Sequence, residues 1–170
     1  KKKIIKTPII LIASKELISR QMKKLGYNFN FKLIDKNLNQ FRYIDNRMIN
    51  IINVDFKFKK TFDKISDKSN KYIQECFKIA LKVIQNNEYS GLINGPISKK
   101  NLLKDKFLGI TEYLAVKTNK ENKIAMLIYN KKLSVSPITT HLPLKDVHKN
   151  ISKQKIINQV NLIVNFYKKN

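Results

Sequence analysis

The 170-residue sequence contains one cysteine, no tryptophan, four glycines and four prolines. The single cysteine, Cys76, excludes an internal disulfide framework and a cysteine-rich metal site. No apolar stretch approaches the roughly 18 residues that a membrane-spanning helix needs. The apolar stretch at 8–13 is also too short for a signal peptide. Hydrophobic residues still make up 42% of the chain, so we expect a folded cytoplasmic protein with no membrane partner.

Acidic side chains are scarce as well, since 12 stand against 35 basic ones and the formal net charge is +23. Such a charge raises the question of nucleic-acid binding. Only Arg20, Arg42 and Arg47 are arginines, however, and proteins that bind bases and phosphates favour the bidentate arginine side chain. Lysine, asparagine and isoleucine are abundant together, and all three have A/T-rich codons. We therefore attribute the charge to solvated lysines and expect no nucleic-acid partner.

Apolar patterns predict strands that alternate with helices. Strands are expected at 9–13, 29–34, 48–54, 89–94, 124–129 and 133–138, the last two as a pair. Helices are expected at 14–25, at 66–86, from about 98, from about 111, and at 152–170. The helix at 66–86 carries one apolar stripe, formed by Ile73, Phe77, Ala80, Leu81 and Ile84, with Cys76 beside it as a buried structural thiol. The alternation predicts an α/β fold with a mixed, mainly parallel sheet flanked by helices.

The end of the predicted strand at 89–94 carries the first group of residues suited to chemistry. Sites in open α/β sheets form where strands end. Here Gly95 lets the backbone approach a ligand and Pro96 fixes the turn. Ser98 opens a helix whose N–H groups favour an anion, and Lys99 or Lys100 offers a positive charge to a phosphate group. A plain strand-to-helix turn explains the same residues.

The second group follows the predicted strand at 133–138. His141, held by a following proline, suits a metal ligand or an acid–base group, and a hydrogen-bonded structural histidine is the alternative. The other histidine, His148, lies in a lysine-rich segment and is expected at the surface.

Four sequence blocks follow one another in a specific order and spacing. They are Asn-Gly-Pro-Ile-Ser-Lys at 94–99, Leu-Gly-Ile-Thr-Glu-Tyr-Leu-Ala at 108–115, Ala-Met-Leu at 125–127 and Thr-Thr-His-Leu-Pro-Leu at 139–144. In this arrangement the chain resembles the 4-hydroxythreonine-4-phosphate dehydrogenase family of vitamin B6 synthesis, and 8–17 resembles an early strand and helix of that family. The resemblance implies an isocitrate/isopropylmalate dehydrogenase-like fold, a homodimer, NAD and a divalent metal (Zn, Mg or Co). It also implies oxidation and decarboxylation of a small phosphorylated amino acid, 4-phosphohydroxy-L-threonine, to 3-amino-2-oxopropyl phosphate.

The resemblance also implies roles for particular residues. His141 matches a metal ligand of the family, and Thr111 matches a substrate-binding threonine. The block around Thr111 usually reads Gly-His-Thr-Glu, so Ile110 stands where the family has histidine, and that substrate contact is absent or replaced. Three residues of the strand-end block match without an assigned role: Gly95, Pro96 and Lys99.

The family's opening glycine-rich segment and its later histidine blocks have no match within 1–170. We therefore expect 1–170 to be a partial dehydrogenase chain that is inactive alone. Two other interpretations stay open. Ile110 makes a related dehydrogenase of phosphorylated threonate or erythronate conceivable, and a non-catalytic α/β binding module that kept the fold but lost the site belongs to a different class.

Overall fold

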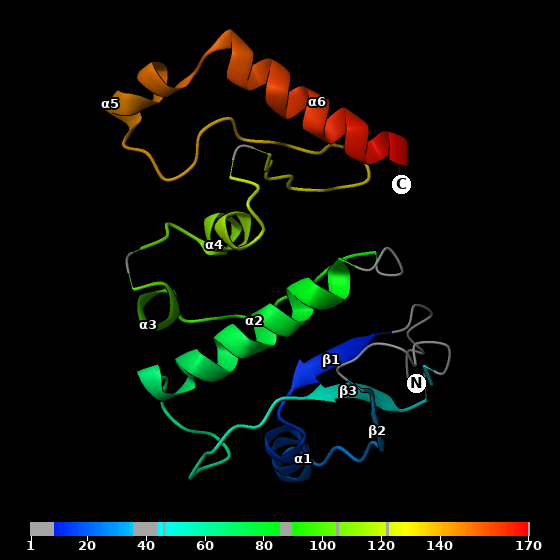
Figure 1. Cartoon of the computed structure of the whole chain (residues 1–170). Helices are drawn as coiled ribbons and strands as arrows, with labels where there is room; N and C mark the ends of the chain where they lie inside the picture. The colour runs from blue at the N-terminus through cyan, green and yellow to red at the C-terminus, as the bar shows by residue number, and fades with distance from the viewer. Residues whose placement is uncertain are drawn as a thin grey trace. The chain divides into compact units, whose positions relative to one another are not determined.

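The computed structural model describes residues 9–35, 44–45, 47–85, 90–104, 106–121 and 123–169 (Figure 1). The chain divides into two compact units, Lys1–Leu102 and Leu103–Asn170. The first unit contains β1 (Ile10–Ala13), α1 (Lys15–Lys24), β2 (Phe31–Leu33), β3 (Ile49–Asn53), the 3-10 turn η2 (Asp67–Ser69), α2 (Asn70–Ile84) and most of α3 (Lys99–Leu103). The second contains α4 (Ile110–Lys117), α5 (Leu144–Val147), the 3-10 turn η3 (His148–Asn150) and α6 (Lys153–Lys169).

Three parallel strands form the sheet of the first unit, in the order β1-β3-β2. Ile51 of the middle strand pairs with Leu11 on one side and Leu33 on the other. Ile51 and Ile52 are fully buried, and successive strand residues face opposite sides of a sheet, so both faces are covered at this strand. The prediction of an α/β fold with a parallel sheet and helices around it is confirmed.

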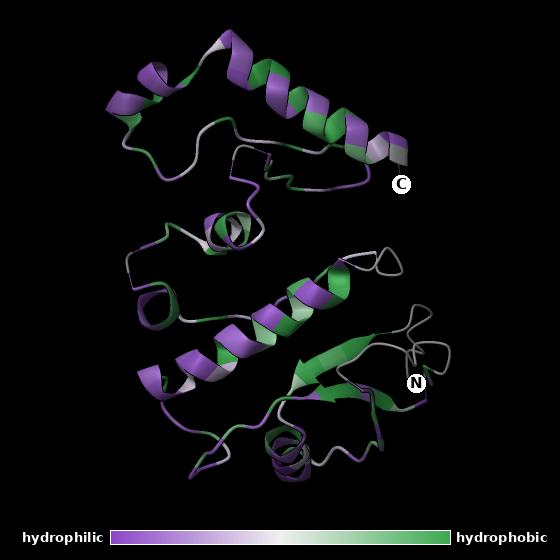
Figure 2. Ribbon diagram, viewed as in Figure 1, coloured by the Kyte–Doolittle hydropathy of each residue, from purple (hydrophilic) through white to green (hydrophobic). Residues whose placement is uncertain are grey.

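α2 packs along the sheet, whose strands β1 and β3 are largely hydrophobic (Figure 2). Val83 joins a buried cluster with Ile34 and Ile52, and Ile79 packs against that cluster. The predicted apolar stripe of α2 is confirmed at Phe77 and Ala80, which are buried, but it omitted Ile79 and Val83. Periodicity identifies the apolar face of a helix, but which residues of that face become buried depends on where the sheet packs against it.

Hydrogen bonds at the first turn of α1 join this helix to α2 and to β3. Ser14 caps the helix as predicted, since its Oγ accepts a hydrogen bond of 3.3 Å from the backbone N–H of Leu17. The Ser14 N–H donates to the Tyr72 hydroxyl of α2 at 2.9 Å. The Lys15 N–H donates to Asn53 Oδ1 at the end of β3, at 2.8 Å. The start of α1 is therefore fixed by α2 and by the middle strand.

Two predicted strand regions are wrong or reduced. Residues 90–94 form no strand, and Ile93 is 89% exposed; Tyr89, also predicted in this strand, lies outside the described residues. A strand needs a neighbour to complete its hydrogen-bond ladder, and no described segment provides one here. The predicted pair at 124–129 and 133–138 is reduced to one antiparallel bridge between Ile128 and Val135. Both side chains are exposed, so no packed layer extends the pairing.

The predicted helices are confirmed, with small differences at their ends. α1, α3, α4 and α6 begin within one residue of the predicted starts. α2 begins at Asn70 because 67–69 form a 3-10 turn instead of the first α-helical turn. The short elements α5 and η3 were not predicted, since one helical turn is too short for a periodic pattern. No helix in the described part of the chain is long and apolar enough to cross a membrane.

We expect Ser14→Ala to lower the free energy of unfolding by about 1 kcal/mol, because the first turn of α1 loses its N-cap. Ser19→Ala, an exposed position in the same helix, is the matched control and should change it by less than about 0.5 kcal/mol. Chemical denaturation followed by circular dichroism measures both variants. Equal effects of the two substitutions would contradict the assignment of Ser14 as the cap.

Candidate active site

The strand-end block predicted at 94–99 lies in the first unit, in an exposed segment ahead of α3. Gly95, Pro96 and Lys99 are all exposed. A β-carbon built on Gly95 would meet no atom within 4 Å, so nothing in this structure packs against that side of the glycine. The other predicted site residues belong to the second unit.

A polar network ties this block to the start of α2. Ser98 Oγ donates to Asn101 Oδ1 at 2.6 Å, and Asn101 Nδ2 donates to Asp67 Oδ1 at 3.2 Å. Asn70 Nδ2 donates to the Asn101 carbonyl at 2.7 Å and to Asp67 Oδ1 at 3.1 Å. Ser98 thus opens α3 as predicted, while the part played by Asn70 and Asp67 carried no signal in the sequence.

His141 lies in a loop between the bridged segment and α5, and not directly after a sheet strand as predicted. Its side chain is exposed, and its backbone φ of 56° lies in the left-handed region. Gln159 of α6 donates to the Pro137 carbonyl at 2.8 Å, on one side of the loop. On the other side the Asp146 N–H donates to the Pro143 carbonyl at 2.9 Å. The loop is therefore tied to α6 at one end and passes into the first turn of α5 at the other.

Ile110 and Thr111 form the first turn of α4, with Gly109 as the N-cap residue. The position of α4 in the second unit is fixed by Tyr113, which is buried and packs edge-on against Phe107 with ring centroids 5.4 Å apart. Burial raises the pKa of the Tyr113 hydroxyl. The first turn of α4 is thus part of a packed element.

His141 lies against this first turn, although the two blocks are far apart in the sequence. A β-carbon built on Gly109 would lie 3.9 Å from His141 Nε2 and 2.9 Å from Glu112 Oε2. Gly109 is buried, and Glu112 Oε2 is buried without a hydrogen-bond partner among the described residues. The structure therefore brings Gly109, Glu112 and His141 together, and Thr111 belongs to the same helical turn.

Glu112 is the residue that the sequence reasoning missed as a site residue. A glutamate at the third position of a helix is common, because it stabilises the helix N-terminus. Glu112 lies in the block that resembles the family, but its position in the helix alone does not distinguish it from such a capping residue. The distinguishing feature is the burial of one carboxylate oxygen beside a histidine, which only the structure reveals.

The chemistry of the pair suits part of a metal site. Imidazole nitrogen and carboxylate oxygen are ligand types that zinc and related divalent cations accept in proteins. Within the ranges that the structure describes, no three His, Cys, Asp or Glu side chains are close enough to hold a metal ion. His141 as a metal ligand therefore stays a prediction. A complete metal site would need further ligands from residues outside the described ranges or from another chain.

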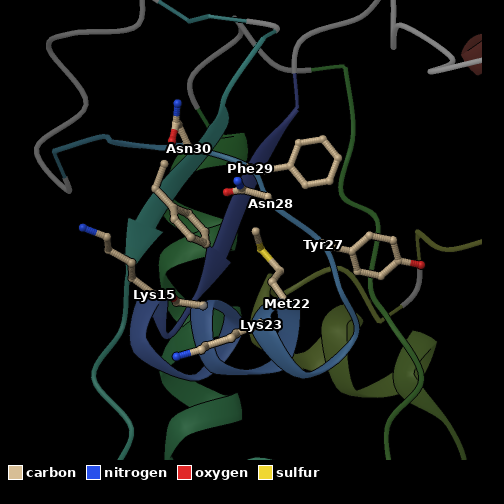
Figure 3. Close-up of a pocket in the computed structure, with 9 residues that line it drawn as sticks. Lys15, Met22, Lys23, Tyr27, Asn28, Phe29 and Asn30 are labelled. Atoms are coloured by element: carbon tan, nitrogen blue, oxygen red, sulfur yellow. The ribbon is translucent and has the colours of Figure 1, made fainter.

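Two open pockets lie in the first unit, and neither is lined by a predicted site residue. Figure 3 shows one of about 480 Å³ beside α1, with Met22 and Phe29 among its lining side chains. The other, of about 690 Å³, lies at the carboxyl ends of β1 and β3, where α/β proteins often bind ligands. Asn53 in that pocket accepts from the Lys15 N–H and donates to Asp55 Oδ1, so its amide is already engaged within the protein.

Cys76 is half-buried on α2, near Tyr72. Burial raises the pKa of the Cys76 thiol, and burial likewise raises the pKa of Tyr72 to about 12. A raised thiol pKa leaves little thiolate at neutral pH, and the thiolate is the nucleophilic form. These properties support the prediction of a structural thiol.

The parallel sheet and its helices place the chain in the class of α/β proteins, here with a histidine–carboxylate pair in a separate unit. The sequence model of the family described as "Pyridoxal phosphate biosynthetic protein PdxA" matches residues 5–170. The chain belongs to this family.

Curated relatives carry one name. A 4-hydroxythreonine-4-phosphate dehydrogenase from Sulfurihydrogenibium sp. is 33% identical over 91% of this chain and 47% of its own length. The protein of the same name from Wigglesworthia glossinidia brevipalpis is 27% identical over 99% of this chain and 52% of its own length. The name denotes an oxidoreductase. The chain spans about half the length of these curated relatives.

Solved structures support the same fold. The crystal structure of 4-hydroxythreonine-4-phosphate dehydrogenase from Klebsiella pneumoniae has a TM-score of 0.79 and 17% identity, over 99% of this chain and 51% of that one. The structure of the enzyme of that name from Burkholderia phymatum has a TM-score of 0.74 and 19% identity, over 89% of this chain and 46% of that one. At this identity the likeness establishes the fold.

We expect the Cys76 thiol to react with a disulfide reagent at least about 10-fold more slowly in the native chain than in the denatured chain, near pH 8. Burial and the raised pKa of the thiol both lower the concentration of accessible thiolate. Release of the chromophoric thiol from the reagent gives both rates, and a Cys76→Ser variant provides the blank. Equal rates in the two states would contradict the structural interpretation of Cys76.

Proposed function

We propose that the complete protein is an NAD- and metal-dependent dehydrogenase of vitamin B6 synthesis. It would oxidise and decarboxylate 4-phosphohydroxy-L-threonine to 3-amino-2-oxopropyl phosphate, as a cytoplasmic homodimer with an isocitrate/isopropylmalate dehydrogenase-like fold. Family membership supports the activity. For this chain, the proposal depends on one observation, the approach of His141 to the first turn of α4. This approach brings together the block to which the resemblance assigns metal binding and the block to which it assigns substrate binding.

His141 would hold the divalent metal. Its imidazole is exposed, so a ligand can reach it, and the neighbouring Glu112 carboxylate makes the surroundings favourable to a cation. When bound, the metal would lower the pKa of the substrate hydroxyl and stabilise negative charge, and NAD would accept a hydride. One histidine with water cannot hold a catalytic ion firmly, so the proposal requires further ligands.

Thr111 would bind the substrate. It lies in the first turn of α4, where its hydroxyl can donate and accept hydrogen bonds. The strand-end residues Gly95, Pro96 and Lys99 stay without an assigned role. Lys99 is exposed and therefore available to an anionic group, but it belongs to the other unit of the chain.

Ile110 is the observation that favours a second candidate function. Its side chain cannot donate a hydrogen bond, so a substrate group that the family's histidine would contact must be bound otherwise or be absent. A related dehydrogenase of phosphorylated threonate or erythronate is consistent with such a change.

The two candidates predict different substrate preferences. If the protein acts in vitamin B6 synthesis, the complete gene product should have its highest kcat/KM with 4-phosphohydroxy-L-threonine. Ile110→His should leave 4-phosphohydroxy-L-threonine the preferred substrate. If the protein is the related dehydrogenase, phosphorylated threonate or erythronate should be the preferred substrate, and Ile110→His should reduce that preference. NADH absorbance with each substrate and divalent metal measures kcat/KM. A folded protein without activity on either substrate would instead indicate a non-catalytic module.

The chain's two histidines provide a matched pair for testing the metal assignment. In the complete protein, His141→Ala should lower kcat/KM at least about 100-fold, because a metal ligand is lost. His148→Ala removes an exposed imidazole on η3 and should leave kcat/KM unchanged. NADH absorbance measures both variants, with metal and then with chelator.

Two further measurements complete this test. The chain 1–170 alone should show no NAD reduction, because a single matched metal ligand does not make a catalytic site. Full activity of His141→Ala, or activity of the wild-type protein that survives chelation, would show that His141 is not a metal ligand.

A further inference from the structure

Glu112 carries a buried polar atom that the rest of the second unit leaves unsatisfied. Its Oε2 is buried and accepts no hydrogen bond from a described residue. A buried carboxylate oxygen without a partner is costly, and most buried polar atoms in proteins are hydrogen-bonded. Such an atom calls for an explanation, and the neighbouring residues indicate one.

The N-cap glycine leaves space for this carboxylate. The backbone of Gly109 is extended, with φ −161° and ψ −178°, a conformation open to any residue. A β-carbon at this position, however, would lie only 2.9 Å from Glu112 Oε2. The absence of a side chain at Gly109 is therefore what permits the carboxylate to occupy its present position.

The imidazole of His141 approaches the same point. Its Nε2 would lie 3.9 Å from a β-carbon on Gly109, so Nε2 and Glu112 Oε2 border the same space beside the glycine without a hydrogen bond between them. A glutamate that served only as a helix cap would direct its oxygens to the backbone N–H groups of the first turn. Glu112 Oε2 accepts none of these, and the nearby imidazole is a potential donor.

We propose that Glu112 is a positioning residue for His141. When a divalent cation binds His141, a hydrogen bond from His141 Nε2–H to Glu112 Oε2 would fix the orientation of the ring and leave Nδ1 for the cation. Histidines that bind metals usually donate their other ring N–H to a carboxylate or carbonyl, and loss of that partner typically weakens metal binding 10–100-fold. The proposal rests on the proposed function, since it assumes that His141 binds a metal.

The test uses the complete, metal-free protein and Co²⁺ as the probe. Isothermal titration calorimetry gives the Kd, and the visible spectrum of bound Co²⁺ reports its ligand geometry. Glu112→Gln should weaken Co²⁺ binding about 10–100-fold and alter the spectrum. Glu121→Gln, which removes one exposed carboxylate from the same unit, is the charge-matched control and should leave both unchanged.

A second variant guards against a simple loss of folding. Gly109→Ala keeps the Glu112 carboxylate but displaces it from the position beside Gly109, so it should also weaken Co²⁺ binding. The thermal unfolding temperature of each metal-free variant, compared with wild type, reports any structural effect separately. Weaker Co²⁺ binding by both variants, with unfolding temperatures near wild type, supports the positioning role.

Three outcomes would overturn the proposal, and they are distinguishable. If the Glu112→Gln variant binds Co²⁺ as wild type does, while His141→Ala does not bind it, Glu112 has no positioning role and the proposed function stands. A lower unfolding temperature of metal-free Glu112→Gln with an unchanged Co²⁺ Kd would make Glu112 a helix cap only. If wild type and His141→Ala bind Co²⁺ equally, the metal assignment of the proposed function fails, and the role of Glu112 fails with it.

Discussion

The burial of the middle strand β3 is the constraint on which the first unit depends. Ile51 and Ile52 have no exposed surface and face opposite sides of the sheet. A parallel strand buried on both faces needs a neighbour on each edge and cover on each side. β1 and β2 supply the edges, and Val83 of α2 contributes to the cover. The strand ends at Asn53, whose amide accepts the Lys15 N–H, so the end of β3 also fixes where α1 begins.

Elements that are defined by local chemistry were predictable from the sequence. Ser14 is a helix-capping residue ahead of an amphipathic segment, and the short apolar runs of β1 and β3 are typical of buried parallel strands. The strand predicted at 89–94 failed because pairing depends on a neighbour that a local pattern does not contain. For the same reason, the pair predicted around Ile128 and Val135 retains a single bridge.

The same distinction between local sequence patterns and tertiary contacts applies to the candidate site. His141 was predicted because an unusual residue type follows an apolar stretch in a recognisable block. Glu112 was not, because its position in a first helical turn has an ordinary explanation. The approach of Glu112 to His141 depends on the path of the loop 137–143 relative to α4, which arises from contacts between distant residues such as Gln159 and Pro137. Sequence patterns therefore located one member of the pair, and tertiary structure supplied the other.

Two unfavourable features coincide at this place in the second unit. Left-handed backbone costs a residue with a β-carbon about 1–2 kcal/mol. Asn119 also has a positive φ, but it lies just beyond the last turn of α4, where helices commonly end in that conformation. His141 follows no helix, and beside it Glu112 Oε2 lacks the partner that a buried oxygen normally has. By contrast, the buried Asn50 amide both donates to and accepts from the Asp45 backbone.

A packed unit retains backbone strain and an unsatisfied buried oxygen at one point only where other contacts compensate for them. The edge-on packing of Tyr113 against Phe107 holds α4, and Gln159 holds the loop through the Pro137 carbonyl. These contacts stabilise the surroundings without relieving either feature. Strained backbone is concentrated at binding and catalytic sites, where it positions groups for a ligand. A buried polar atom without a hydrogen-bond partner likewise requires an explanation, such as a catalytic role or a bound ion. Their coincidence at Gly109, Glu112 and His141 is the physical basis of the proposal that the functional centre of this unit lies there.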